Sequence, residues 1–168
     1  MKQFITYKAM VVAALACAFV LALAGCMSVP DQIHEETEGA NAQRQYMAQL
    51  NEEMAGLQQV MDDFQVAVSE QNTVAMKAQI QKSDRIVANI EASEPTEELA
   101  NVKELYVDAL QTLNGAMVDY ADLYMQVENS GIDADEFEQR IEEVQSAYDE
   151  GVEKLQAADD AVAALAQD

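Results

Sequence analysis

The chain has 168 residues, of which 31 are acidic and nine are basic, and it contains one His, two Cys and no Trp. A net charge of −22 argues against nucleic acid as a partner, because phosphates are bound by clustered Lys and Arg. The scarcity of His and Cys argues against zinc ribbons, haem sites and disulfide scaffolds. Half of the residues are hydrophobic, which is enough for one packed domain with a tether.

The first 26 residues differ in composition from the rest. Lys2 and Lys8 supply a short positive segment, and residues 9–24 are apolar without a charge. This run is shorter than the about 20 residues that a membrane-spanning helix needs. It ends in Leu23-Ala24-Gly25-Cys26, with small residues directly before a cysteine. Together these features predict a secretory signal peptide.

Leu23-Ala24-Gly25-Cys26 resembles the lipobox of bacterial lipoproteins in sequence and in distance from the start of the chain. The resemblance implies that the Cys26 thiol receives a diacylglyceryl group, that a signal peptidase cuts between Gly25 and Cys26, and that the new N-terminus can be acylated. The expected partner of acylated Cys26 is membrane lipid, on the extracytoplasmic face of the cell membrane. Two or more acyl chains attach a protein stably without a transmembrane helix. An ordinary cleaved signal and a membrane helix that contains a cysteine remain the alternatives.

This processing divides the chain into three parts. Residues 1–25 form the cleaved signal peptide, residues 26–41 the lipidated cysteine with a flexible tether, and residues 42–168 the folded domain. The tether contains Pro30 and Gly39 and has no periodic apolar face. Because Cys17 leaves with the signal and Cys26 is modified, no free thiol is expected in the mature protein.

From residue 46 onward, apolar residues recur at intervals of three and four, which predicts helices packed along a seam with left-handed, coiled-coil-like supercoiling. The predicted fold is an all-α antiparallel bundle of four helices, or of three if the first two are continuous across Ser69–Thr73. The predicted seam consists of Met47, Leu50, Met54, Leu57, Met61, Phe64 and Val68; Met76, Ile80, Ser83, Val87 and Ile90; Leu99, Val102, Tyr106, Ala109, Leu113, Ala116, Tyr120, Leu123 and Val127; and Phe137, Ile141, Val144, Tyr148, Gly151, Leu155, Ala158, Val162 and Leu165.

Two further helix boundaries are indicated by the residues themselves. Ser93-Glu94-Pro95 is expected to end one helix and start the next, because Ser caps helices and Pro is tolerated in a first turn. Gly131 is expected to adopt a left-handed cap conformation. After it, Asp133 and Glu136 are expected to form a capping-box-like pair. Ile132 and Phe137 lie at the positions of a hydrophobic staple.

The basic residues of the second helix suggest an electrostatic role. Lys77, Lys82 and Arg85 make residues 71–93 the only segment of the domain without a net negative charge. We expect this helix to lie between acidic helices and to reduce their mutual repulsion.

Acidic pairs at Asp62-Asp63, Asp133/Asp135 and Asp159-Asp160 raise the question of calcium. They lack the alternating oxygen ligands, the turn glycine and the final bidentate Glu of a calcium loop, so we expect no metal site and at most diffuse, weak association of divalent cations. The only His is His34 in the tether, which leaves no Glu-x-x-His pair for a di-iron centre. We therefore expect no catalytic residue and no cofactor.

Tyrosines and methionines at helical spacing are expected in the core. Tyr106, Tyr120 and Tyr148 lie on the seam, and Tyr124 lies one turn after Tyr120. The alternative is that these four tyrosines form a ligand-binding strip. Met47, Met54, Met61 and Met76 fill gaps in the core or form an adaptable binding surface. Gly115 is expected to lie near Ala147 and Tyr148 and to make room for the Tyr148 ring.

The sequence thus predicts a membrane-anchored extracytoplasmic lipoprotein with a non-catalytic binding or scaffolding domain, for which an envelope protein is the candidate partner. The alternative is an accessory lipoprotein that captures a small ligand or metal ion between its helices for a transport system. A cavity walled by Tyr and Met would favour capture, and a filled core would favour a protein partner.

Overall fold

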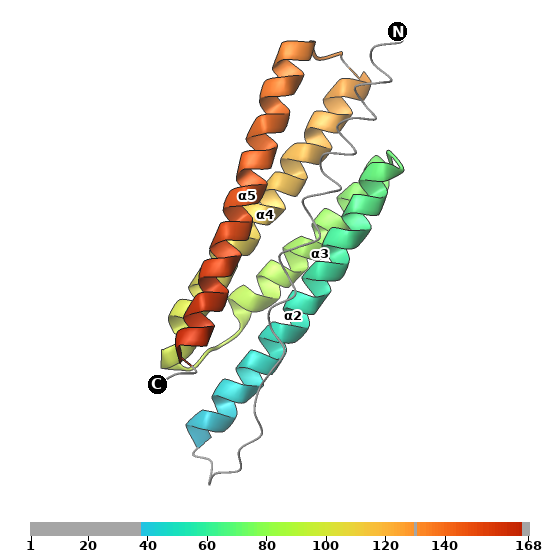
Figure 1. Cartoon of the computed structure of the whole chain (residues 1–168). Coiled ribbons are helices and arrows are strands. Elements are labelled where there is room, and N and C mark those ends of the chain that lie inside the picture. Colours follow the sequence, from blue (N-terminus) through green and yellow to red (C-terminus); the bar gives the residue numbers. More distant parts are fainter. Residues whose placement is uncertain (1–37, 130, 166–168) are drawn as a thin grey trace.

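The computed structural model describes residues 38–129 and 131–165, and this part of the chain is all-α with no strand (Figure 1). Four long helices follow one another: α2 (Glu38–Ser69), α3 (Thr73–Ala92), α4 (Ala100–Asn129) and α5 (Ala134–Leu165). A short 3-10 helix, η1 (Glu97–Leu99), leads into α4. The predicted all-α fold with four helices is confirmed. Helix α2 begins at Glu38, ahead of the predicted domain boundary at residue 42.

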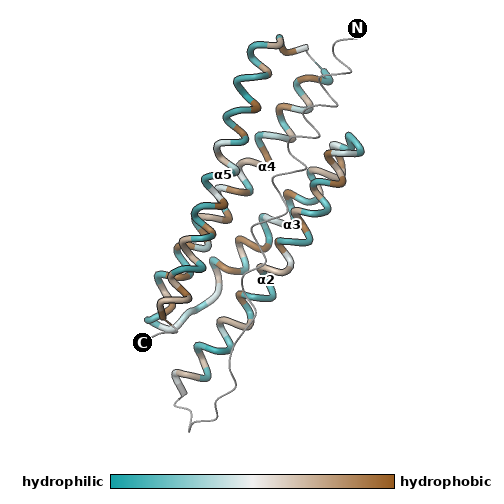
Figure 2. Tube along the Cα trace, in the orientation of Figure 1, coloured by the Kyte–Doolittle hydropathy of each residue, from teal (hydrophilic) through white to brown (hydrophobic). Residues whose placement is uncertain are grey.

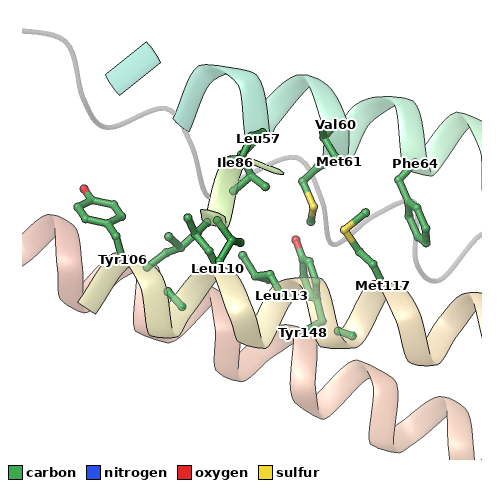
Figure 3. Close-up of a cluster of buried hydrophobic side chains, with 14 of the residues drawn as sticks. Leu57, Val60, Met61, Phe64, Ile86, Tyr106, Leu110, Leu113, Met117 and Tyr148 are labelled. Carbon is green, nitrogen blue, oxygen red and sulfur yellow. The ribbon is translucent and has the colours of Figure 1, made fainter. Parts of the chain in front are cut away.

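The helices form two antiparallel hairpins, α2–α3 and α4–α5 (Figure 1). Helices α4 and α5 pack against each other most extensively, and α3 packs against both α2 and α4. The extensive backbone contacts between the described helices thus follow the order of the chain. Side chains also meet across the centre of the bundle, where Tyr148 of α5 points toward Met61 of α2 (Figure 3).

The break between α2 and α3 falls at residues 70–72, within the predicted segment Ser69–Thr73. Gln71 has a positive φ of 56°, which turns the chain back on itself. The Asn72 side chain then accepts a hydrogen bond of 3.0 Å from the Ala75 amide and caps α3. The polar stretch thus ends one helix and starts the next, which gives four helices rather than three.

The connection from α3 to α4 differs in detail from the prediction. Ser93 does not start the next helix: it follows the end of α3, where its hydroxyl donates a 2.6 Å hydrogen bond to the Ile90 carbonyl. Pro95 lies before the first turn rather than in it, and Thr96 precedes η1. Ser93 and Thr96 have extended backbone conformations at the two ends of this link. Glu94 precedes Pro95, and a residue before a proline avoids the helical conformation.

The turn into α5 has the glycine conformation and the Asp133 cap that were predicted. Gly131 has a φ of 65°, in the left-handed region that glycine adopts without strain. The Asp133 carboxylate accepts a 2.9 Å hydrogen bond from the Glu136 amide, which caps the first turn of α5. Ile132 and Phe137, the predicted staple residues, are both half-buried.

The predicted seam is the core of the domain. Most of its residues are buried, and Leu165, at the end of α5, is the exposed exception with 42% of its surface accessible. Figure 2 shows that each helix carries hydrophobic and hydrophilic residues along its whole length, as the amphipathic pattern requires. Ser83 is the one buried polar seam residue, and its hydroxyl finds no hydrogen-bond partner.

The seam pattern missed a second row of buried residues. A 3.5-residue repeat describes one contact stripe per helix, whereas α4 contacts both α3 and α5, and its side chains also reach those of α2 (Figure 3). Its buried face is correspondingly wide. The buried residues outside the predicted seam are Tyr46, Val60, Ala67, Ile86, Leu110, Met117 and Ala121.

The prediction that Gly115 makes room for Tyr148 is wrong. Gly115 is exposed, and a Cβ built there would meet nothing within 4 Å. The close approach of α4 and α5 is instead at Gly151, where a Cβ would lie 2.6 Å from Leu113 Cγ and 3.1 Å from the Leu113 amide nitrogen. Gly151 on α5 is thus the residue that lets Leu113 of α4 come close.

Candidate functional site

The predicted lipidation site lies outside the described residues. Gly25 and Cys26, the predicted cleavage and acylation positions, and His34 of the predicted tether all fall within residues 1–37. Within residues 38–129 and 131–165, no helix is long and apolar enough to cross a membrane.

A buried tyrosine joins α4 to α5. The hydroxyl of Tyr106, a residue that is 4% exposed, donates a 2.5 Å hydrogen bond to Asp159 Oδ1. Hydrogen bonds to an ionised acceptor are short and strong. Asp159, which belongs to the acidic pair Asp159-Asp160 considered above for calcium, is therefore part of a helix–helix contact.

A lysine makes the other polar link between α4 and α5. The ammonium nitrogen of Lys154 lies 3.1 Å from Asp108 Oδ2, 2.9 Å from Glu150 Oε1 and 3.1 Å from Thr112 Oγ1. Hydrogen bonds to Glu150 and Asp108 hold the pKa of Lys154 above its ordinary value. A single basic side chain thus offsets two acidic residues on adjacent helices.

The charge relief expected from α3 is carried by Lys82. Its ammonium nitrogen lies 3.6 Å from Asp63 Oδ2 of α2, whereas Arg85 donates to the Gln81 carbonyl within its own helix. Lys77 and Arg85 form no ion pair with the described residues. Helix α3 lies between α2 and α4, as expected, and among the described residues Lys82 is the basic residue of α3 that forms an ion pair with a neighbouring helix.

Neutral amides and a lysine supply further polar contacts of α3. Asn89 donates to Glu53 of α2 at 2.9 Å, and Asn114 of α4 donates to Asp84 at 2.6 Å. The Lys103 ammonium donates to the Ser93 carbonyl at 2.7 Å, just after α3 ends. Cations are favourable near a helix C-terminus because of the helix dipole.

The seam tyrosines lie in the core, as predicted. The Phe64 and Tyr120 rings meet edge to face, with centroids 6.1 Å apart and an angle of 73° between planes. Figure 3 shows Tyr148 of α5 pointing between α4 and α2, toward Met61 and Met117. Burial, with smaller effects of Tyr124 and Asp149 respectively, raises the pKa of Tyr120 and of Tyr148 to about 12. Tyr124 is only half-buried.

The other acidic pairs are distributed over separate surface contacts. Asp63 accepts from Gln59 at 2.8 Å, and Asp160 accepts from Gln156 at 3.0 Å. Asp133 is a helix cap, and Asp62 and Asp135 are exposed. Over residues 38–129 and 131–165, no group of three or more His, Cys, Asp or Glu side chains is arranged to hold a metal ion.

An acidic surface feature is an open depression on α5 with a volume of about 530 Å³. Four carboxylates and two neutral polar side chains line it: Glu142, Gln145, Ser146, Asp149, Glu150 and Glu153. By contrast, the space beside Tyr46 and Ile90, between α2 and α3, has no room for a water molecule. The exposed large hydrophobic side chains are Val66, Val74 and Leu165.

Sequence reasoning missed the polar contacts between α4 and α5. Lys154 is the only basic residue between residues 141 and 165, and it lies four residues after Glu150. That isolation in an acidic helix was a usable signal for an ion pair. The pairing of Tyr106 with Asp159 left no such signal, because 53 residues separate the two.

Comparisons with known proteins identify no relative. No family model matches the chain, and neither the curated proteins nor the solved structures contain a match.

Proposed function

We propose that this protein is a membrane-anchored extracytoplasmic lipoprotein whose helical domain acts by binding or scaffolding and not by catalysis. The observation that carries the proposal is the order of features at the N-terminus: two lysines, an apolar run and Leu23-Ala24-Gly25-Cys26. Acylated Cys26 would hold the protein on membrane lipid, because two buried acyl chains are sufficient for stable attachment.

The described domain is compatible with this role. Helix α2 starts at Glu38, so 12 residues from Cys26 to Thr37 would connect the lipid to the bundle. The N-terminus of α2 and the C-terminus of α5 lie at the same end of the bundle (Figure 1). This end would face the membrane, and the α2–α3 and α4–α5 turns would point away from it.

Packing supports a binding surface on the outside of the bundle. The seam tyrosines are used in helix contacts, through Tyr106 with Asp159 and Tyr120 with Phe64. Side chains from α2, α4 and α5 fill the centre in Figure 3. No specific observation favours capture of a small ligand, so that alternative is not carried further.

The anchor is tested by replacing Cys26 with serine in the full chain, expressed in a bacterium that processes lipoproteins. We expect Cys26→Ser to abolish lipid labelling and cleavage before residue 26, and to prevent stable membrane attachment of any processed product. Cys17→Ser is the matched control, since it removes a thiol within the signal, and it should leave processing and attachment unchanged. Lipid labelling that persists in Cys26→Ser would disprove the proposal.

A further inference from the structure

The last described turn of α5 differs in composition from the rest of the helix. Residues 141–160 include seven acidic residues, whereas residues 161–165 have the sequence Ala-Val-Ala-Ala-Leu and carry no charge. Ala163, Ala164 and Leu165 are exposed, and 42% of the Leu165 surface is accessible. Residues 161–165, called the α5 tip below, therefore present uncharged and apolar side chains to the surroundings.

The α5 tip lies at the end of the bundle where α2 begins (Figure 1). Under the proposed function, lipidated Cys26 precedes Glu38, the first residue of α2, by 12 residues. A segment of this length reaches at most about 40 Å when fully extended. Helix α2 has 32 residues, so the α2–α3 turn lies a further distance of about 48 Å along the helix. The end of the bundle that contains the α5 tip is therefore the end held close to the lipid.

The other exposed large hydrophobic side chains of the described residues lie elsewhere. Val66 and Val74 are 53% and 78% exposed, and both lie beside the α2–α3 turn at the opposite end of the bundle (Figure 1). Val74 is thus more exposed than Leu165 but is far from the predicted anchor. The two ends of the molecule therefore allow the effect of position to be separated from the effect of an exposed apolar side chain.

A contact as small as the α5 tip depends on the anchor. One leucine and a few alanines bury little apolar area, so they hold a free protein on a membrane only weakly. Once a short segment links the domain to the lipid, the second contact becomes intramolecular, with an effective concentration in the range of about 1 mM. Weak apolar contacts are then sufficient to orient the domain.

The charges at this end indicate which lipid fits. The hydrogen bond between Tyr106 and Asp159 joins the start of α4 to the end of α5. Helix η1 directly precedes α4, and its residues Glu97 and Glu98 are exposed. Because these carboxylates are repelled by anionic headgroups, the α5 tip fits a zwitterionic phospholipid surface.

We propose that the α5 tip is a second membrane contact, which inserts Leu165 among the headgroups of zwitterionic phospholipids when Cys26 is anchored. This inference rests on the proposed anchor and specifies which part of the domain touches the membrane. The contact holds the starts of α2 and α4 toward the lipid. The α2–α3 and α4–α5 turns then point away from the membrane, where they are accessible to a protein partner.

The test uses the lipidated protein, produced from the full chain and reconstituted into phosphatidylcholine vesicles. The chain contains no Trp, so one substitution introduces a single fluorescent reporter. Ala164→Trp places the reporter in the α5 tip, and Val74→Trp places it at the opposite end, both at exposed positions. Bromine atoms on the acyl chains quench a nearby Trp. Brominated lipid should lower the emission of Ala164→Trp about twofold and that of Val74→Trp by less than about a tenth, because an interfacial side chain reaches the boundary between headgroups and acyl chains.

A further pair of variants separates apolar contact from mere proximity to the lipid. Leu165→Asp, added to Ala164→Trp, should reduce the quenching to the level of Val74→Trp, because a carboxylate does not enter the headgroup–acyl boundary. Val74→Asp, added to Ala164→Trp, is the matched control: it replaces an exposed apolar side chain by the same charge at the other end, and quenching should stay at about twofold. Circular dichroism of each variant verifies that it is folded.

Three results would overturn the inference in protein that floats with the vesicles. The first is unchanged emission of Ala164→Trp in brominated lipid, and the second is equal quenching of Val74→Trp. The third is quenching that Leu165→Asp does not reduce, which would mean that the anchor alone brings the reporter close to the lipid. Flotation is measured in the same samples. Protein that does not float contradicts the anchor itself and this inference with it, so failure of the tip contact and failure of the anchor are distinguishable.

Discussion

The two hairpins have a similar helical geometry although their net charges differ. Residues 38–92, which form α2–α3, carry eight acidic and four basic residues, whereas residues 100–165, which contain α4–α5, carry sixteen acidic and three basic residues. Yet α4 and α5 are the most extensively packed pair of the described helices. The packing of α4 against α5 includes the close approach at Gly151, the ion pairs of Lys154 and the hydrogen bond of Tyr106.

The comparison teaches that buried contact, and not net charge, decides which helices hold together. Surface charges are screened by water and salt, so repulsion between exposed carboxylates on α5 is weak. Apolar contact along a full helix contributes more, at about 25 cal/mol for each Å² removed from water. The α2–α3 hairpin is bound to the other mainly through α3 and through side chains such as Phe64.

The largest expected effect comes from removing Phe64, which is 2% exposed and contacts Tyr120 of the other hairpin. Phe64→Ala should lower the free energy of unfolding by about 3–5 kcal/mol. Amide hydrogen exchange should show α2 and α3 losing protection before α4 and α5. Val66→Ala, at a neighbouring position that is 53% exposed, is the control and should stay within about 0.5 kcal/mol. Simultaneous loss of protection in all four helices would contradict the difference between the hairpins.

The second prediction concerns the close approach within α4–α5. Gly151→Ala should destabilise the protein by about 2–3 kcal/mol, because the new Cβ meets the Leu113 side chain and backbone. Gly115→Ala is the matched control in the same hairpin, where a Cβ meets nothing. It should stabilise by about 0.5–1 kcal/mol through the higher helix propensity of Ala. Chemical denaturation measures both, and equal effects of the two substitutions would refute the assigned contact.

The third prediction uses alkali to weaken the more tightly packed hairpin. The folded-state pKa of Tyr120 is about 12, above the ordinary 10.0, so the unfolded state loses its phenol proton first as pH rises. Stability from this group is complete below pH 10 and falls as pH rises toward 12, by about 1–2 kcal/mol. The measurement is urea denaturation between pH 9 and 12. Tyr120→Phe should reduce the pH dependence, of which Tyr148 retains a part because its pKa is also raised to about 12. An unchanged slope in this variant would contradict the assignment.

The smallest effect is expected at the surface ion pair of α2–α3. Lys82→Glu should lower stability by less than about 1 kcal/mol and should do so more at low salt than at high salt, since it places a carboxylate beside Asp63. Lys77→Glu, which changes the same charge at a position without an ion pair, should have a smaller effect. Thermal unfolding at two salt concentrations distinguishes them, and equal losses at both would argue against an electrostatic cause.

Much of the fold could be predicted because local rules apply along the chain. The spacing of apolar residues predicted the buried faces, and the break at residues 69–73 and the cap at Asp133 follow from the chemistry of turns. The wrong assignment of Gly115 has a clear cause. The predicted register, with Gly115 opposite Ala147 and Tyr148, is close to the observed contact of Leu113 with Gly151. Gly115 itself lies on the exposed side of α4, so the close contact is made at the glycine of α5.

By itself, the sequence determined that the domain consists of amphipathic helices, where the turns between them fall, and one buried stripe of each helix, because helix period and capping act over a few residues. It also contains the lipobox-like segment on which the proposed anchor depends. Only the tertiary structure decided which helices pack most extensively, that Tyr106 meets Asp159, and that Gly151 lies against Leu113. The physical reason is that a helix with apolar residues on one side can pack against any similar neighbour. Only the summed fit of all the side chains selects which neighbours it takes.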